Sequence, residues 1–110
     1  MKLPNVEHAV IEIEKLRDYC LSTSHPRGRH KARVFSTALG MTANDSEELR
    51  DSILSAIVSE EALPTEQDQH GQRYVVDFTL KRQDKEAVVR SSWIVRVGED
   101  YPRLTSCYVL

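Results

Sequence analysis

Between Gln72 and Leu80 the chain reads QRYVVDFTL, a stretch in which apolar and polar residues largely alternate. Successive side chains of a β-strand point to opposite faces of a sheet, so this pattern predicts a strand that is buried on one side. The apolar side of that strand would hold Tyr74, Val76, Phe78 and Leu80. Its polar side would hold Arg73, Asp77 and Thr79.

Two further stretches read as strands, EAVVRSSWIVRVG (Glu86–Gly98) and RLTSCYVL (Arg103–Leu110). In the first, one side holds Ala87, Val89, Trp93, Val95 and Val97, and the other holds Arg90, Ser92, Ile94 and Arg96. The polar segment KRQDKE has the length of a hairpin loop, and GEDYP supplies the next turn. Three strands joined by such short links predict an antiparallel meander.

The first half of the chain has helical spacing instead, with apolar residues every three or four positions. Gly40 is placed to end the second helix, and Asn44 or Asp45 to begin the third. The segment LPTEQDQHGQ (Leu63–Gln72) has neither period and is interpreted as the linker between the two halves. The three predicted helices lie in IEKLRDYCL (Ile13–Leu21), from about Arg29 to Leu39, and in NDSEELRDSILSAIVSEEA (Asn44–Ala62).

Together these elements predict an α+β fold. About three N-terminal helices would pack on one face of a three- to four-stranded antiparallel sheet. A length of 110 residues fits one domain, mainly helical over 1–62 and made of antiparallel strands over 72–110. The uncovered face of the sheet would then collect polar side chains.

Composition narrows the functional class further. The chain is 40% hydrophobic and 29% charged, as is usual for a soluble globular protein. It has no apolar run of the roughly 18 residues needed to cross a bilayer, so we expect a cytoplasmic protein without membrane contact. Cys20 and Cys107 lie far apart without CxxC spacing, which indicates neither a disulfide framework nor a metal site. We therefore expect no cofactor.

The charges are distributed unevenly. No acidic residue lies between Asp18 and Asp45, whereas residues 45–68 hold eight acids against Arg50. The stretch SHPRGRHKARVF (Ser24–Phe35) places four cations around the start of the second helix, where free N–H groups and the helix dipole favour a phosphate. The other interpretation is that these side chains are solvated and pair with the acidic third helix.

The uncovered sheet face and this basic stretch supply the candidate ligands for phosphate. Several arginines and hydroxyls on neighbouring strands repel one another unless solvent or an anion meets them. An ordinary solvated sheet face is the other interpretation. The candidate ligands are Arg27, Arg29, Arg33, Arg73, Ser92, Arg96 and Ser106.

Catalytic candidates come from the same two regions. His30 is a candidate general acid or base, since histidine is the side chain most often used for that task, or it is a surface histidine without a task. On the last strand, Arg103 offers a guanidinium, Thr105 or Ser106 a hydroxyl, and Tyr108 a phenol that donates to an oxyanion or stacks on a base. Tyr108 is alternatively a core residue.

Several motifs, which span nearly the whole chain, carry a resemblance to a known family: LPN, KLRDYCL, HPRGRHKARVF, HGQRYVVDF, SSWIVR and PRLTSCYVL. Together they resemble a family of small bacterial domains of unknown function, found alone and within polymorphic-toxin and prophage proteins. That family has no established activity, so this resemblance implies a fold and a context but no reaction.

More distantly, helices followed by a meander that ends on a Thr/Ser and a Tyr resemble the ribonuclease toxins that include barnase, EndoU, colicin and RelE-type enzymes. This resemblance implies metal-independent cleavage of RNA, by attack of a ribose 2′-hydroxyl on the adjacent phosphate, and restraint by a cognate antitoxin or immunity protein. The final strand reads Thr-Ser-Cys-Tyr-Val where many of these toxins have Thr-x-Tyr-Pro. The catalytic residues implied are His30, Lys31, Arg90, Arg103, Thr105 and Tyr108.

Two hypotheses follow from these patterns. The leading one is a ribonuclease toxin domain whose partners are RNA and an antitoxin. The alternative is a non-catalytic protein-interaction module, such as an immunity or adaptor protein. Catalysis requires the candidate side chains of the basic helix and of the last two strands to converge on one cleft, whereas a binding module does not.

Overall fold

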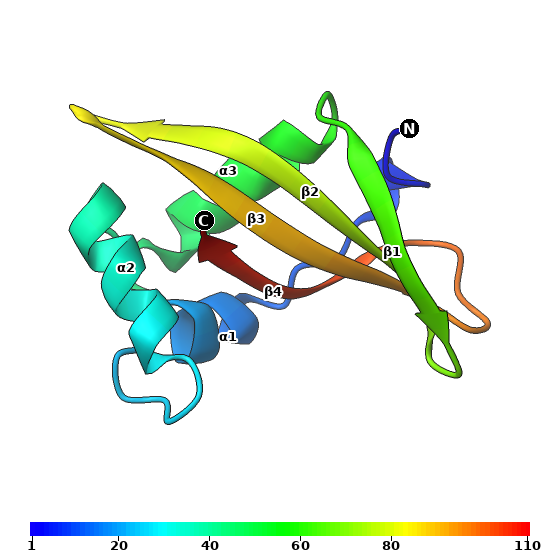
Figure 1. The fold of residues 1–110 in the computed structure, drawn as a ribbon, viewed down its shortest axis with the longest axis horizontal. Coiled ribbons are helices and arrows are strands. Elements are labelled where there is room, and N and C mark those ends of the chain that lie inside the picture. The colour runs from blue at the N-terminus through cyan, green and yellow to red at the C-terminus, as the bar shows by residue number, and fades with distance from the viewer.

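The computed structural model describes all 110 residues as a four-stranded antiparallel sheet with helices packed against it (Figure 1). The α+β class and the antiparallel meander predicted from sequence are confirmed. The strands are neighbours in chain order, β1-β2-β3-β4. Their bounds are β1 Ala62–Asp68, β2 Gly71–Arg82, β3 Lys85–Arg96 and β4 Arg103–Val109.

The long hairpin of β2 and β3 is the centre of the sheet. Its turn is shorter than the predicted loop, because the strands run up to Arg82 and from Lys85, and Gln83 takes a positive φ of 57°. Tyr74 pairs with Trp93 and Phe78 with Val89, so the predicted apolar sides of the two strands form one face. The prediction for Val97 was wrong, since β3 ends at Arg96 and Val97 is 74% exposed.

The segment interpreted as a linker contains strand β1, so that part of the prediction was wrong. β1 pairs with β2 from Ala62↔Val76 to Asp68↔Gly71, with a register shift between Pro64 and Gln67. Only Ala62 of this strand is buried. An edge strand that is solvated on both faces has no hydrophobic period, and a proline is tolerated there because the strand has a free side. Its pairing with β2 therefore leaves no mark in the sequence.

The α-helices lie within the predicted ranges, but the predicted end of the third helix was wrong: α3 ends at Ile57, and Ala62 already belongs to β1. The first helix begins as α1 and continues as a single π-helical turn, η2, while short 3-10 turns η1 and η3 precede α1 and α3. Gly40 ends the second helix in the left-handed conformation (φ 66°) as predicted. Thr42 and Asp45 form a reciprocal capping box ahead of the third helix. The bounds are η1 Val6–His8, α1 Ile13–Lys15, η2 Leu16–Cys20, α2 Arg29–Leu39, η3 Ala43–Asp45 and α3 Ser46–Ile57.

The hydrophobic core lies between α3 and the apolar face of the sheet. Leu49, Ile53 and Ile57 of α3 are fully buried and belong to one cluster with Val76 and Trp93. The indole N–H of Trp93 donates to the Ser91 hydroxyl (2.9 Å), and that hydroxyl donates to the Val76 carbonyl (2.8 Å). Every polar atom of this buried pair is therefore satisfied, which removes the cost of placing Ser91 inside the core.

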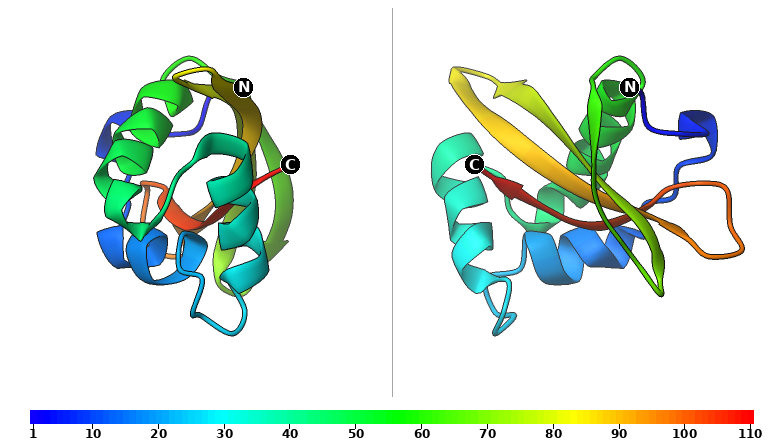
Figure 2. Two further views of the ribbon diagram at one scale, coloured as in Figure 1. Left: turned by 90° about the vertical axis from the view of Figure 1, so that its left-hand side faces the viewer. Right: turned by 45° about the vertical axis from the view of Figure 1, so that its right-hand side comes forward.

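The helices do not all lie squarely on one face. In Figures 1 and 2, α3 runs along the sheet while α2 lies beside β4, near the C-terminus of the chain. α2 buries a narrow stripe of Ala32, Phe35 and Leu39, which suits packing at an edge better than packing across a broad face. This placement brings the basic start of α2 next to the last strand.

Arg82 fixes the junction between α2 and α3 to the end of the hairpin. Its guanidinium donates to the carbonyls of Leu39 (3.1 Å) and Gly40 (2.8 Å), which are unpaired at the end of α2. It also pairs with Asp45 (3.1 Å) and Glu48 (2.8 Å). The acids at the start of α3 are thus bound to the sheet, not to the basic residues of α2.

Candidate functional site

An open cleft of about 620 Å³ lies between the N-terminal helical turns and β4. Its walls come from α1 and η2, from the loop that leads into α2, and from β4. The side chains are almost all polar, and the sheet contributes two adjacent hydroxyls. The lining residues are Glu12, Glu14, Lys15, Asp18, Tyr19, His25, Arg27, Thr105 and Ser106. We call this the β4 cleft.

Two cations, Arg27 in the turn before α2 and Lys31 in the first turn of α2, lie near hydroxyl-bearing residues of β4. Ser106 and Tyr108 are two positions apart on β4 and therefore share one face of the strand. Arg27 and Ser106 both line the β4 cleft. The Lys31 Nζ lies 4.3 Å from the centroid of the Tyr108 ring, a cation–π contact. We call Arg27, Lys31, Ser106 and Tyr108 together the strip along β4.

Arg90 adds a third cation beside Tyr108. The two residues are paired across β3 and β4, and Asp77 is the partner of Arg90 on β2, so all three share the outer face. Asp77 holds the guanidinium in a two-point contact of 2.8 and 2.9 Å. Hydrogen bonds to Asp77 and then to Tyr108 raise the pKa of Arg90 further above its usual range. Arg90 is thus a fixed, permanently charged group two-thirds covered by its neighbours.

His25 is held rigidly at the mouth of the β4 cleft. Its Nδ1 accepts hydrogen bonds from the backbone N–H groups of Arg27 (3.0 Å) and Gly28 (3.2 Å). Its ring packs edge-on against Tyr19 with centroids 4.8 Å apart. Because Nδ1 accepts, Nε2 carries the proton of the neutral ring and can donate to an anion. Sequence reasoning gave this residue no role; its signal was the turn sequence HPRG, in which the histidine precedes the helix.

The four cations before and within α2 have no acidic partner. None of the ion pairs of the protein involves Arg27, Arg29, Lys31 or Arg33. The interpretation in which they pair with the acidic third helix therefore does not describe this fold. Arg29 and Arg33 are exposed on α2, as is His30, which forms no hydrogen bond and lines none of the clefts.

Arg103 lies apart from this group, although sequence reasoning placed it in the same site. Arg103 lies five positions before Tyr108 along β4, about 16 Å at the rise of a strand. Glu99 binds its guanidinium at 2.9 and 3.1 Å, and the Tyr101 hydroxyl accepts from it at 2.9 Å. Hydrogen bonding to Glu99 raises the pKa of Arg103 above its usual range, and the same contact lowers the pKa of Glu99.

The remaining predicted ligands occupy the middle and far end of the outer face. Arg73 pairs with Asp68 (3.2 Å) and Glu66 (3.6 Å). Thr105 sits at a register shift between β3 and β4, and its hydroxyl donates to the Ser92 carbonyl (3.1 Å). A smaller cleft of about 360 Å³ at this end is lined by Arg73, Arg96, Thr105, His70 and Ile94.

The structure thus brings together about half of the predicted site. Lys31, Arg90 and Tyr108 form one contact group, and Arg27, Thr105 and Ser106 line the adjoining β4 cleft. No group of three or more His, Cys, Asp or Glu side chains is arranged to hold a metal ion. Cys20 and Cys107 are both buried, and the neighbouring Cys20 thiol together with burial raises the pKa of Cys107. Neither thiol is exposed to the cleft.

Comparison with known proteins gives one match. A family model described as a domain of unknown function, DUF6883, matches residues 2–110. No curated protein and no solved structure matches the chain. None of its helices is long and apolar enough to cross a membrane.

Proposed function

Since the chain belongs to DUF6883, a family of unknown function, we propose from its own geometry that it is a metal-independent ribonuclease domain of the toxin type. The observation that carries the proposal is the strip along β4, where Lys31 lies on the Tyr108 ring and Arg90 lies beside the same phenol. The transition state of phosphate-ester cleavage needs cations to stabilise its growing negative charge and an acid to donate a proton to the leaving oxygen. The two cations and the phenol could supply both at this position.

The reaction proposed needs no co-reactant. The ribose 2′-oxygen forms a bond to the adjacent phosphorus while the bond from phosphorus to the 5′-oxygen breaks. A base takes the 2′-hydroxyl proton, and an acid gives a proton to the departing 5′-oxygen. The products are a 2′,3′-cyclic phosphate and a 5′-hydroxyl end.

The residues of the strip divide these tasks. Arg27 and Arg90 hold the phosphate and take up its growing negative charge. Lys31 and Tyr108, which touch each other, supply the proton to the leaving oxygen. Glu14 lines the β4 cleft without an ion-pair partner and is the carboxylate best placed to accept the 2′ proton. His25, whose Nδ1 is occupied, donates a hydrogen bond from Nε2 and positions the phosphate.

The test uses the purified full chain, a labelled RNA oligonucleotide and EDTA. We expect cleavage to leave 2′,3′-cyclic phosphate ends. Lys31→Ala and Tyr108→Phe should each slow it about 100-fold or more, the usual contribution of a general acid. Lys81→Ala is the matched control, because Lys81 is an exposed lysine on β2 whose ion-pair partner is Glu86 of β3. An oligonucleotide lacking 2′-hydroxyls should remain intact.

Two results would contradict this function. One is RNA that stays intact in the presence of well-folded protein, and the other is cleavage of the oligonucleotide without 2′-hydroxyls. In cells, expression of the chain alone should slow bacterial growth and fragment RNA, and Tyr108→Phe should relieve both. The proposal includes a cognate antitoxin or immunity protein as partner, which would cover the β4 cleft.

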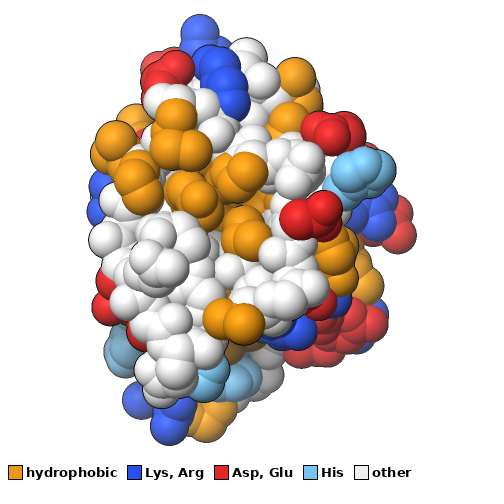
Figure 3. Space-filling model, turned by 90° about the vertical axis from the view of Figure 1, so that its right-hand side faces the viewer, with side chains coloured by type: hydrophobic (Ala, Val, Ile, Leu, Met, Phe, Trp, Pro, Cys, Tyr) orange, Lys and Arg blue, Asp and Glu red, His pale blue; other side chains and the backbone are white.

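One observation favours a second candidate, a non-catalytic interaction module. Arg73, Arg90 and Arg103 are each already paired with an acid of the same chain, which lowers their attraction for phosphate. Apolar side chains also gather on the side of the molecule away from α2 (Figure 3). A module of this kind should capture a protein partner with unchanged affinity in Lys31→Ala and Tyr108→Phe.

A further inference from the structure

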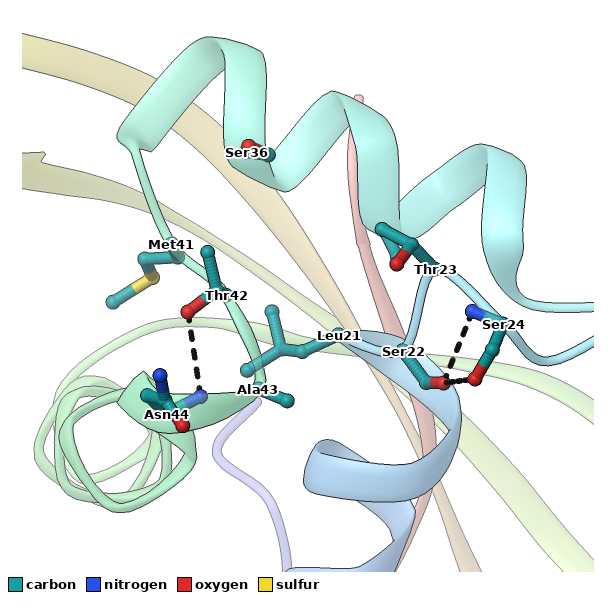
Figure 4. Close-up of a pocket in the computed structure, with 10 residues that line it drawn as sticks. Leu21, Ser22, Thr23, Ser24, Ser36, Met41, Thr42, Ala43 and Asn44 are labelled. Atoms are coloured by element: carbon teal, nitrogen blue, oxygen red, sulfur yellow. Dashed lines mark hydrogen bonds between the residues drawn. The ribbon is translucent and has the colours of Figure 1, made fainter.

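A second cavity lies between the loop that leads into α2, α2 itself and the segment that follows it (Figure 4). It encloses about 290 Å³, near the lower limit for small-molecule sites. Leu21, Ala32 and Met41, all buried, form its apolar part. Its polar part consists of uncharged side chains from three segments: Ser22, Thr23, Ser24, Ser36, Thr42 and Asn44. We call this the hydroxyl pocket.

Half of these polar groups are available to a ligand. The Ser22 and Ser24 hydroxyls bond each other at 3.1 Å, and the Thr42 hydroxyl accepts from the backbone N–H of Asn44 at 3.3 Å. The side chains of Thr23, Ser36 and Asn44 have no hydrogen-bond partner within the protein, and Figure 4 shows them around the cavity on three different segments. Together they offer two hydroxyls and one amide, which can both donate and accept.

The chemistry of the lining defines the class of ligand. No charged side chain lines the pocket, so nothing there compensates the charge of a phosphate or an ammonium group. Buried apolar side chains suit a flat ring face, and the amide and hydroxyls suit a polar ring edge. A ring of that kind, small enough for this volume, is a nucleobase.

We propose that the hydroxyl pocket binds an unpaired nucleobase of the RNA, an inference that rests on the proposed function. Ser24 of the pocket and Arg27 of the β4 cleft are three residues apart, so their backbones lie within about 10 Å. A single RNA strand can therefore place a phosphate at Arg27 and a neighbouring base in the pocket. Bases of single-stranded RNA are recognised in this way, splayed out and hydrogen-bonded along their edges.

Titration of the full chain with the four ribonucleosides, followed by amide NMR shifts, tests this directly. Ribonucleosides carry no phosphate, so they bypass the β4 cleft. We expect saturable shifts at residues 22–24 and 41–44 with at least one nucleoside, at an affinity of about 1 mM. Ser36→Leu, which fills the cavity from an exposed position on α2, should abolish them. Thr23→Val and Asn44→Ala should each weaken binding about threefold or more.

The controls separate this proposal from the ribonuclease proposal. Ser55→Ala changes a hydroxyl on α3 outside the pocket and should leave nucleoside binding unchanged, as should Lys31→Ala. Nucleoside binding without any RNA cleavage would overturn the ribonuclease alone. Absence of shifts at about 10 mM nucleoside, equal shifts in Ser36→Leu, or the same shifts with glucose and none with nucleosides would overturn the pocket assignment.

Discussion

The two ends of the outer sheet face differ in how their positive charge is satisfied. At the end near the β3–β4 turn, Arg103 is held by Glu99 and Tyr101, and Glu12 approaches it at 3.7 Å. At the end near α2, Lys31 contacts the Tyr108 ring and has no acidic partner. The sequence offers arginine or lysine candidates at both ends. The fold neutralises Arg103 at one end and leaves Lys31 free to meet an anion at the other.

The largest expected effect is the difference in cleavage rate between two variants, each of which removes one cation at one end. Lys31→Ala should lower the rate of RNA cleavage about 100-fold, because Lys31 lies at the proposed reaction centre. Arg103→Ala should change the rate by less than about threefold, since Glu99 already neutralises that guanidinium. Cleavage rates measured at saturating RNA decide the point. Equal losses in the two variants would mean that the whole face, not the α2 end, is the site.

Glycines at the two ends give the next test. A Cβ at Gly28 would lie 2.4 Å from the backbone oxygen of Tyr19, so Gly28→Ala must displace the loop that carries His25 and Arg27. We expect a loss of about 1–3 kcal/mol in the free energy of unfolding, as for overpacked sites, and weaker RNA binding. Urea denaturation and fluorescence anisotropy measure the two.

Gly98 is the matched position at the other end. A Cβ there meets nothing within 4 Å, but the residue has φ +87°. Gly98→Ala should therefore cost about 1 kcal/mol of stability through backbone strain while RNA affinity stays the same. Parallel losses of affinity in both glycine variants would show that binding follows overall stability and not the position of the α2 loop.

The salt dependence of RNA affinity compares the two ends with substitutions of surface arginines, which disturb the fold less. Each cation that neutralises a phosphate of a single strand adds about 0.7 to the slope of log affinity against log salt concentration. Arg27→Ala should lower that slope by about 0.7, because Arg27 has no acidic partner. Arg73→Ala should leave it unchanged, since Asp68 and Glu66 already pair with Arg73. An unchanged slope in Arg27→Ala would remove Arg27 from the RNA site.

Most of the fold could be predicted from the spacing of hydrophobic residues along the sequence. The strands β2, β3 and β4 and the helices α2 and α3 have strong hydrophobic periods and clear end signals, such as Gly40. Strand β1 could not be predicted, because it is exposed on both faces after Ala62 and is held mainly by its pairing with β2. Edge strands of this kind are specified by their partner, not by their own residues.

The structure brings some of the predicted site residues together and separates others. Lys31 and Arg90 were named from the resemblance to ribonuclease toxins and Tyr108 for its phenol, and the packing of α2 against β4 brings the three together. Arg103 was chosen for its guanidinium, but residue type does not reveal that Glu99 turns back to bind it. His25 was not selected, because its position is fixed by two backbone hydrogen bonds to Nδ1. These bonds depend on the shape of the loop, which residue type does not reveal.

The smallest expected effect is the pH dependence of the neutralised end. The hydrogen bond from Arg103 lowers the pKa of Glu99 in the folded state, so the folded protein binds the Glu99 proton more weakly than the unfolded chain does. The pair therefore stabilises the fold above the ordinary carboxyl pKa of about 4.3, and this contribution is lost as the pH falls through the lowered value. In Glu99→Gln, the free energy of unfolding should fall less steeply below pH 5 than in the parent protein. Between pH 6 and pH 7 the change in this free energy should be the same in the two proteins. An equally steep acid decline in that variant would mean that other carboxylates, such as Asp68 or Glu61, account for it.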